Sequence, residues 1–222
     1  GRVPVIAGSG ANCTAVAVET SQDYARLGVD GLLVVTPYYN KCTQNGLVKH
    51  YFEIADKVDK EIILYSVPGR TGVNILPETA LKLSKHSNIN AIKEASGNIE
   101  QIAEIKRITN LDVYSGDDGL TFSVLALGGS GVISVASNVI PQLVSELCES
   151  FFDGNLEKAR ALQFEISPLI KLLFSEVNPI PVKKAASLMN LCENVLRMPL
   201  TQMQPENART LEEELKKILI SN

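Results

Sequence analysis

The sequence predicts an α/β fold built on a parallel sheet, and two observations support this prediction. Short β-branched runs alternate with longer helical patterns along most of the 222 residues, which is the order of repeated βα units. Several of these runs are almost continuously apolar, as in parallel strands that are covered on both faces. A doubly wound sheet and a (β/α)8 barrel both satisfy the pattern.

Six strands are expected, and their starts lie about 20 to 30 residues apart, the length of one βα unit. The expected strands are residues 3–8, 31–37, 61–68, 89–95, 111–116 and 131–137. The segments between them carry helical signals, such as Gly28 at a C′ position and Pro77 at an N1 position. The expected helices are 14–28, 46–58, 77–85 and 98–109, followed by an all-helical region at 141–152, 155–174, 181–190 and 207–219.

An eight-stranded barrel would need two more βα units than the sequence displays. The first apolar run begins almost at residue 1, so we expect that two units, roughly 60 residues at about 30 per unit, are missing before it.

Composition excludes several classes of function. The net charge of −4 and pI near 5.3 argue against nucleic acid or an anionic membrane as the main partner. The sequence has no apolar run long enough to span a membrane, and we expect no signal peptide. The four cysteines are far apart and only two histidines occur, so we expect a reduced, cytoplasmic protein without a metal or a cofactor.

The segment GSGANC at residues 8–13 follows a strand and opens a helix. It matches only the first two glycines of a dinucleotide-binding fingerprint, and no acidic residue ends the next strand to bind a ribose. We therefore interpret this segment as a tight turn.

Ionisable side chains gather where the expected strands end, which is where α/β proteins place their chemistry. The motifs are TPYYN at 36–40, LYSVPGRTG at 64–72, IKEASGN at 92–98 and SGDD at 115–118. Each has a structural interpretation as well: a tyrosine can lie at the rim of the core, and Arg70 can be a surface residue. For Asp117 and Asp118 we favour capping of the next helix.

Lys93 is the hardest of these residues to explain structurally, because a lysine is seldom buried without a partner. If side chains alternate, Ile89, Ala91, Lys93 and Ala95 share one face of the strand, and the two alanines leave space beside the lysine. Desolvation lowers the pKa of such an amine, and the neutral amine is a nucleophile toward carbonyl carbons.

These motifs, together with GGSGVISVASN at 128–138 and NPIPVK at 178–183, resemble the dihydrodipicolinate synthase (4-hydroxy-tetrahydrodipicolinate synthase) family of pyruvate-dependent class I aldolases. The resemblance covers essentially the whole chain. It implies a (β/α)8 TIM barrel, of which residues 1–153 would be units three to eight, and a helical subdomain at 154–222. It also implies a homotetramer, a dimer of dimers, in the full-length protein.

The resemblance implies condensation of pyruvate with L-aspartate 4-semialdehyde in diaminopimelate and lysine biosynthesis. Lys93 would form the Schiff base with pyruvate, Tyr65 would relay protons, and Tyr39 would extend that relay across a dimer interface. Arg70 would hold the carboxylate of the aldehyde substrate. The pyruvate pocket would be lined by Ile133, Gly116 and Asn178.

Two departures from the family pattern lead to further expectations. The relay threonines of a Gly-Thr-Thr loop do not occur in this sequence, so we expect little or no activity from the chain by itself. Asn12 and Tyr38 match an allosteric lysine site, but Val16 replaces its glutamate, and we expect weak inhibition by lysine.

Three alternatives remain open. N-acetylneuraminate lyase and 2-keto-3-deoxygluconate aldolase share the lysine and the tyrosine, although the GRTG loop with Arg70 favours the synthase. A non-catalytic binding fragment is the third alternative.

Overall fold

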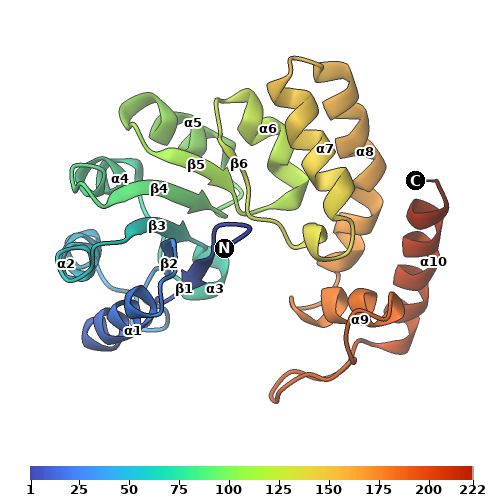
Figure 1. Ribbon diagram of the computed structural model, residues 1–222, viewed down its shortest axis with the longest axis horizontal. Coiled ribbons are helices and arrows are strands. Elements are labelled where there is room, and N and C mark those ends of the chain that lie inside the picture. The colour runs from blue at the N-terminus through green and yellow to red at the C-terminus, as the bar shows by residue number, and fades with distance from the viewer. Residues whose placement is uncertain (222) are drawn as a thin grey trace. The chain divides into compact units, whose positions relative to one another are not determined.

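The computed structural model describes residues 1–221 and contains one six-stranded parallel sheet (Figure 1). The strands lie in sequence order, each beside the next, which confirms the predicted βα succession. They are β1 (Ile6–Gly8), β2 (Gly31–Val35), β3 (Glu61–Ser66), β4 (Ile89–Glu94), β5 (Asp112–Ser115) and β6 (Gly131–Val132).

The two faces of this curled sheet differ in burial. Side chains on one face are fully buried; they include Leu32, Leu64, Ile92 and Val113, each 0% exposed. The residues that alternate with them are less buried, and they include Leu33, Val35, Tyr65, Lys93 and Tyr114. The half-open face is therefore the one on which polar side chains can meet a small molecule.

An irregularity in β4 breaks the alternation that the sequence predicts. Ile89 lies opposite Ile62, but Ala91 lies opposite Ile63, so Asn90 is an extra residue in the register. Ile89 therefore shares the face of Ile62, on the buried side, and not the face of Lys93. The expectation that Ile89 flanks the lysine is wrong, while Ala91 keeps its place on the face of Lys93.

Helices α1 (Thr14–Arg26), α2 (Gln44–Ala55), α4 (Pro77–Leu83) and α5 (Ile99–Ile108) cover the buried face of the sheet (Figure 1). Side-chain caps begin two of them: Thr43 accepts a hydrogen bond from the amide of Gly46, and Asn98 accepts one from Gln101. All four helices are predicted from the sequence. The short helices α3 (Pro68–Thr71) and α6 (Thr121–Ala126) are not, because so few residues show no helical period.

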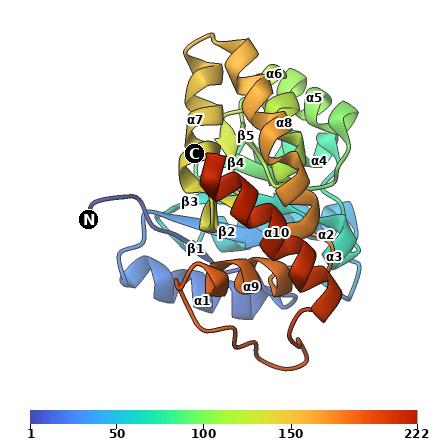
Figure 2. The ribbon, with the colours of Figure 1, turned by 90° about the vertical axis from the view of Figure 1, so that its right-hand side faces the viewer.

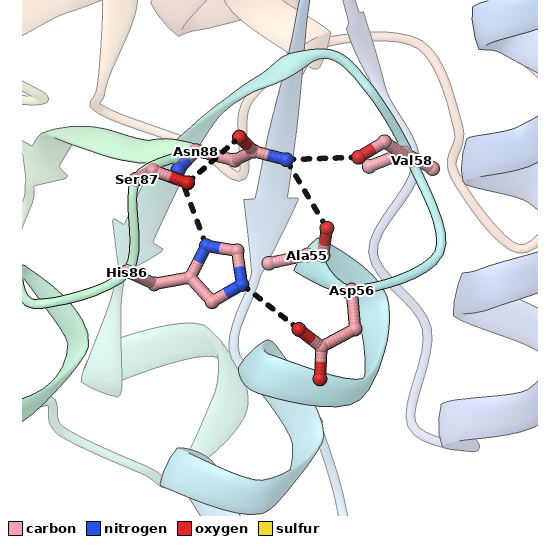
Figure 3. A network of polar contacts seen from close by, with 6 residues as sticks. All are labelled: Ala55, Asp56, Val58, His86, Ser87 and Asn88. Atoms are coloured by element: carbon pink, nitrogen blue, oxygen red, sulfur yellow. Dashed lines mark hydrogen bonds and ion pairs between the residues drawn. The ribbon is translucent and has the colours of Figure 1, made fainter.

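A polar network fixes the amino end of β4 (Figure 3). The side-chain amide of Asn88 donates to the carbonyls of Ala55 (3.2 Å), the last residue of α2, and Val58 (2.8 Å), in the turn between α2 and β3. His86 Nδ1 accepts from the amide of Asn88 at 3.1 Å, so its ring proton lies on Nε2, 3.0 Å from Asp56 Oδ1. This network joins the start of the strand to the preceding βα unit.

Contacts divide the chain into two compact units. The first comprises Gly1–Asp117 and Ala126–Val132, and the second comprises Asp118–Leu125 and the described residues from Ile133 onward. The second unit contains helices α7 (Pro141–Phe152), α8 (Leu156–Leu173), α9 (Ile180–Leu188) and α10 (Pro205–Ser221).

Within the second unit α7 packs against α8, and α10 contacts both α8 and α9 (Figure 2). The four helices expected after residue 140 are confirmed. The boundary expected between residues 153 and 154 remains a prediction, and residue 222 of the expected subdomain lies outside the described residues. In the described part of the chain, no helix has the length and apolar character needed to span a membrane.

Candidate active site

One row of side chains crosses the half-open face near the carboxyl ends of the strands. Val35, Tyr65, Lys93 and Tyr114 are register partners on β2, β3, β4 and β5, and Gly131 of β6 continues the row. Residues paired in register point to the same side of a sheet. The sheet thus places a lysine between two tyrosines.

Lys93 lies directly over Tyr65. Its Nζ atom is 4.4 Å from the centroid of the Tyr65 ring, a distance at which a cation is attracted to the negative face of the ring. One side of the half-buried lysine therefore packs on the Tyr65 ring, and the amine lies close to that phenol.

Gly116, just past the end of β5, makes room for the lysine. A Cβ atom at this position would lie 2.6 Å from the Cβ of Ala95 and 3.1 Å from Cε of Lys93. The amide of Gly116 also donates to the carbonyl of Glu94 at 2.8 Å. Only a residue without a side chain fits between the Lys93 stem and the turn that follows β4.

Tyr65 keeps its proton at neutral pH. Burial raises the pKa of this phenol, and the positive charge of Arg70 acts in the opposite direction with a smaller effect. The hydroxyl is thus a proton donor in the resting protein, and the influence of Arg70 shows that the guanidinium lies near enough to act on it.

Arg70 lies on α3, which begins with Pro68 at its first turn and ends at Gly72 with a φ of 74°. Arg70 itself is exposed. The next residue, Thr71, is buried and accepts a 2.9 Å hydrogen bond from Thr36 at the end of β2, and it donates to the carbonyl of Val73. A buried threonine pair therefore fixes the helix that presents Arg70.

Tyr38 and Tyr39 lie on the loop after β2 and are 43% and 88% exposed. Tyr39 has a φ of 74°, an uncommon backbone conformation for a residue with a bulky side chain. Asn40 ties this loop to the one between β1 and α1, because its side-chain amide donates to the carbonyl of Asn12 at 3.0 Å. Asn12 and Val16 are exposed as well.

Ile133 and Asn178 belong to the second unit, and both are half-buried there. Asn178 helps to line a cavity of about 370 Å³ together with Val135, Pro179 and Lys183. The role in pyruvate binding predicted for Ile133 and Asn178 remains a prediction.

Asp118 has a different role from the helix cap expected for it. Its buried carboxylate accepts hydrogen bonds from the Ser134 hydroxyl and from the amides of Val135 (2.9 Å) and Ala136 (3.3 Å). It thus holds the segment directly after Ile133. The capping prediction for Asp118 is wrong, because its donors lie in a loop that is distant in sequence.

The GSGANC segment forms a loop packed on the neighbouring strand. A Cβ atom on Gly10 would lie 2.5 Å from the amide nitrogen of Val35, so this glycine is required by close approach to β2. That contact supports the interpretation as a tight turn.

Sequence analysis missed two features around the lysine. Tyr114 is one; burial raises the pKa of its phenol, with further contributions from the charges of Asp112 and Glu61. The other is Glu94, which follows Lys93 and is 2% exposed. A carboxylate inside an apolar strand is unusual, and that signal was present in the letters KEA at 93–95.

Metal ligands and disulfides are not part of this arrangement. Within residues 1–221, no group of three or more His, Cys, Asp or Glu side chains is placed to hold a metal ion. The four cysteines are unpaired.

Comparison with known proteins identifies the family. The model of the dihydrodipicolinate synthetase family matches residues 1–218. The 4-hydroxy-tetrahydrodipicolinate synthase of Alkaliphilus oremlandii is 53% identical over 219 residues, which cover 98% of this chain and 76% of that protein.

Solved structures agree with this result. Dihydrodipicolinate synthase from Thermotoga maritima superposes with a TM-score of 0.96 at 47% identity, covering 98% of this chain and 76% of that one. The chloride-inhibited dihydrodipicolinate synthase from Acinetobacter baumannii, solved in complex with pyruvate, gives a TM-score of 0.96 at 42% identity and covers 99% and 76% of the two chains.

Proposed function

Because the chain belongs to the dihydrodipicolinate synthetase family, we propose that it is a class I, Schiff-base lyase of the 4-hydroxy-tetrahydrodipicolinate synthase type. It condenses pyruvate with L-aspartate 4-semialdehyde to give 4-hydroxy-tetrahydrodipicolinate in the diaminopimelate and lysine pathway. The observation that carries the proposal is the pairing of Lys93 and Tyr65 in register, with the amine 4.4 Å from the ring centroid.

Lys93 begins the reaction. Its neutral amine attacks the keto carbon of pyruvate, and loss of water gives a protonated imine. The positive nitrogen then draws electrons from the methyl carbon, which loses a proton to become an enamine. That carbon attacks the aldehyde carbon of the second substrate, and the aldehyde oxygen takes up a proton.

Tyr65 serves the proton transfers. Its raised pKa keeps the phenol protonated, so it can donate to the hydroxyl that leaves as water and take the proton back afterwards. The position of its ring beside the Lys93 amine supports this role. Tyr39, on an exposed loop, extends the relay into the site of a neighbouring subunit in the proposed tetramer.

The remaining residues bind substrate. Arg70 offers an exposed guanidinium that matches the planar carboxylate of the aldehyde. Gly116 leaves the space beside Lys93 in which pyruvate reacts, and the roles proposed for Ile133 and Asn178 are in binding pyruvate. The substrate-binding role of Arg70 also favours the synthase over lyases that act on sugar-derived aldehydes.

We further propose that β1–β6 correspond to strands three to eight of a (β/α)8 barrel in a cytoplasmic dimer of dimers. The parallel order of the six strands supports this assignment. The relay threonines are not among the 222 residues, so the chain by itself turns over slowly. Val16 stands where an effector-binding glutamate would, and inhibition by lysine is weak.

Exchange of the pyruvate methyl protons in D₂O tests the first half of this reaction without the second substrate. The chain should catalyse the exchange, because each enamine that is reprotonated by solvent gains a deuteron. Lys93→Arg, which keeps the charge but cannot form the imine under these conditions, should abolish it. Equal exchange by both proteins would contradict the proposal.

The choice of aldehyde tests the second half. Consumption of pyruvate should be faster with L-aspartate 4-semialdehyde than with a sugar-derived aldehyde such as N-acetylmannosamine, and Arg70→Ala should reduce that preference. Faster reaction with the sugar aldehyde would assign the chain to the lyases instead.

A further inference from the structure

Four polar side chains form a continuous ladder on the covered face of the sheet, behind the candidate site. Ser66 Oγ donates to Asn74 Oδ1 at 3.0 Å. Asn74 and Gln101 exchange two amide hydrogen bonds, of 2.6 and 3.1 Å. Gln101 Nε2 also donates to Glu94 Oε2 at 3.0 Å. Ser66, Glu94 and Gln101 are 0%, 2% and 8% exposed and Asn74 is half-buried, so most of the ladder is shielded from water.

The ends of this ladder are the residues that follow the two reacting side chains. Ser66 follows Tyr65 and Glu94 follows Lys93, and these two pairs lie in register across β3 and β4. Because successive side chains alternate between faces, Tyr65 and Lys93 point to one side and Ser66 and Glu94 to the other. The ladder therefore spans the same two strands from the reverse side.

The Glu94 carboxylate also fixes the turn after β4. Its Oε1 atom accepts the amide of Ser96 at 2.7 Å, which closes the chain back onto the strand end. That turn carries Ala95, the residue whose Cβ meets Gly116 beside the stem of Lys93. Movement of Glu94 would thus be transmitted to the space around the lysine.

Backbone hydrogen bonds already hold the strands, so the ladder is not needed to form the sheet. Apolar side chains could fill the same volume, and burying three polar side chains is favourable only if each finds partners. The donors to Glu94 include the Ser96 amide and the Gln101 side chain, and they suit a carboxylate without a proton. Burial raises the pKa of Glu94, while hydrogen bonds from the Ser96 side chain and amide and from Gln101 oppose the shift. The free-energy cost of burying this carboxylate indicates that Glu94 serves to hold neighbouring groups in position.

We propose that Glu94 and Gln101, together with Asn74 and Ser66, are positioning residues that hold the Lys93 amine in place relative to Tyr65 from the opposite face of the sheet. This inference rests on the proposed Schiff-base function of Lys93. It assigns a role in that reaction to residues that touch neither substrate nor reacting atoms.

The test is the rate at which pyruvate and borohydride together modify the chain, measured over a range of pyruvate concentrations. Glu94→Gln introduces an amide whose donor faces either Ser96 or Gln101, so at least one buried hydrogen bond is lost. The maximal trapping rate should fall about tenfold, which corresponds to about 1.4 kcal/mol, while half-saturation by pyruvate changes little.

A double substitution that swaps the two side chains distinguishes a loss of positioning from a general disruption of the fold. In Glu94→Gln/Gln101→Glu the amide and the carboxylate change places, and a donor again meets an acceptor between the two positions. Trapping should return to within about threefold of the original rate, on the scale on which tenfold is 1.4 kcal/mol. Ser66→Ala, a smaller change at the other end of the ladder, serves if Glu94→Gln fails to fold and should lower the rate about threefold.

Asn88→Ala is the matched control, because it removes three side-chain hydrogen bonds, to Ala55, Val58 and Ser87, from the opposite end of the same strand. It should lower the melting temperature while the trapping rate stays unchanged. If Glu94→Gln and Ser66→Ala behave like Asn88→Ala, the ladder is only structural and the inference is wrong. Absence of any adduct on the unsubstituted chain would overturn the proposed function, and the inference with it.

Discussion

The two ends of β4 are both held by polar networks, but the networks differ in burial and in what they hold. At the amino end, Asn88 and His86 bind a backbone turn, and the aspartate that completes the network is exposed (Figure 3). At the carboxyl end, Glu94 is buried and its partners lead to the strand that carries Tyr65.

Because of this difference, we expect the amino end of β4 to affect mainly stability and the carboxyl end to affect mainly the reaction. Binding a turn through exposed or half-buried groups stabilises the fold, and a lost contact is partly replaced by water. A buried carboxylate that loses a hydrogen-bond donor is destabilised more, since no water replaces that donor. Substitutions at the amino end should therefore change the free energy of unfolding, and substitutions at the carboxyl end should change the reaction.

Tyr65→Phe tests the carboxyl end with the largest expected effect among the following predictions. The ring beneath the amine remains, but the hydroxyl that transfers protons is lost. Exchange of the pyruvate methyl protons should slow by a factor on the order of 10², with little change in melting temperature. An unchanged exchange rate would remove Tyr65 from the relay.

The pH dependence gives a second measure of Tyr65. Because burial raises its pKa above the ordinary value of 10.0, the phenol stays protonated throughout the neutral and mildly alkaline range. Exchange limited by this acid should not decline until the pH exceeds that ordinary value. A decline that begins near pH 8 and persists in Tyr65→Phe would identify a different group.

Gly116→Ala should reduce the trapping rate about tenfold, roughly 1.4 kcal/mol. The new methyl group would meet the Cβ of Ala95 at 2.6 Å and Lys93 Cε at 3.1 Å, so the turn or the lysine must move. Gly69→Ala is the matched control, because a Cβ there meets nothing within 4 Å. Equal rates for the two variants would show that the lysine does not need this space.

Asn88→Ala should lower the free energy of unfolding by about 1 kcal/mol, because two partly buried carbonyls lose a donor that water only partly replaces. Urea unfolding measures this loss. A variant that is as stable as the parent would show that water replaces the side-chain amide. The amino end of β4 would then have no measurable effect on stability, and only the role of the carboxyl end would remain.

His50 gives the smallest effect and lies away from both networks, on α2. Burial lowers its pKa from 6.5 to about 4, and its Nδ1 atom is 2.9 Å from the Thr14 hydroxyl. As the pH falls below 6.5, the unfolded chain binds a proton that the folded protein does not, so stability falls toward pH 4. His50→Gln should remove about 1 kcal/mol of the loss between pH 7.5 and 5.5. Parallel stability profiles would contradict this.

Much of the fold follows from sequence patterns, because βα units are local. Apolar runs and caps predicted all six strands and the four longer helices between them, but not the short α3 and α6. The extra residue at Asn90 was missed, since nothing in the letters INAIKE distinguishes a bulge from regular alternation. That miss placed Ile89 on the wrong face.

The site was predictable in part for the same reason. Strand ends bring residues such as Tyr65 and Lys93 to one edge of a parallel sheet, and the structure places them side by side. The ladder could not be predicted, because Asn74 and Gln101 come from a loop and a helix whose meeting depends on tertiary packing. Asp118 was misassigned for a similar reason, as its donors lie 16 to 18 residues away.

Peptide mapping after reduction with borohydride in the presence of pyruvate tests the central claim most directly. Lys93 should carry the reduced pyruvate adduct, and the other lysines, including Lys106 on α5, should remain unmodified. A folded sample in which Lys93 is unmodified, or in which label is spread evenly over surface lysines, would contradict the assignment of Lys93 as the Schiff-base residue.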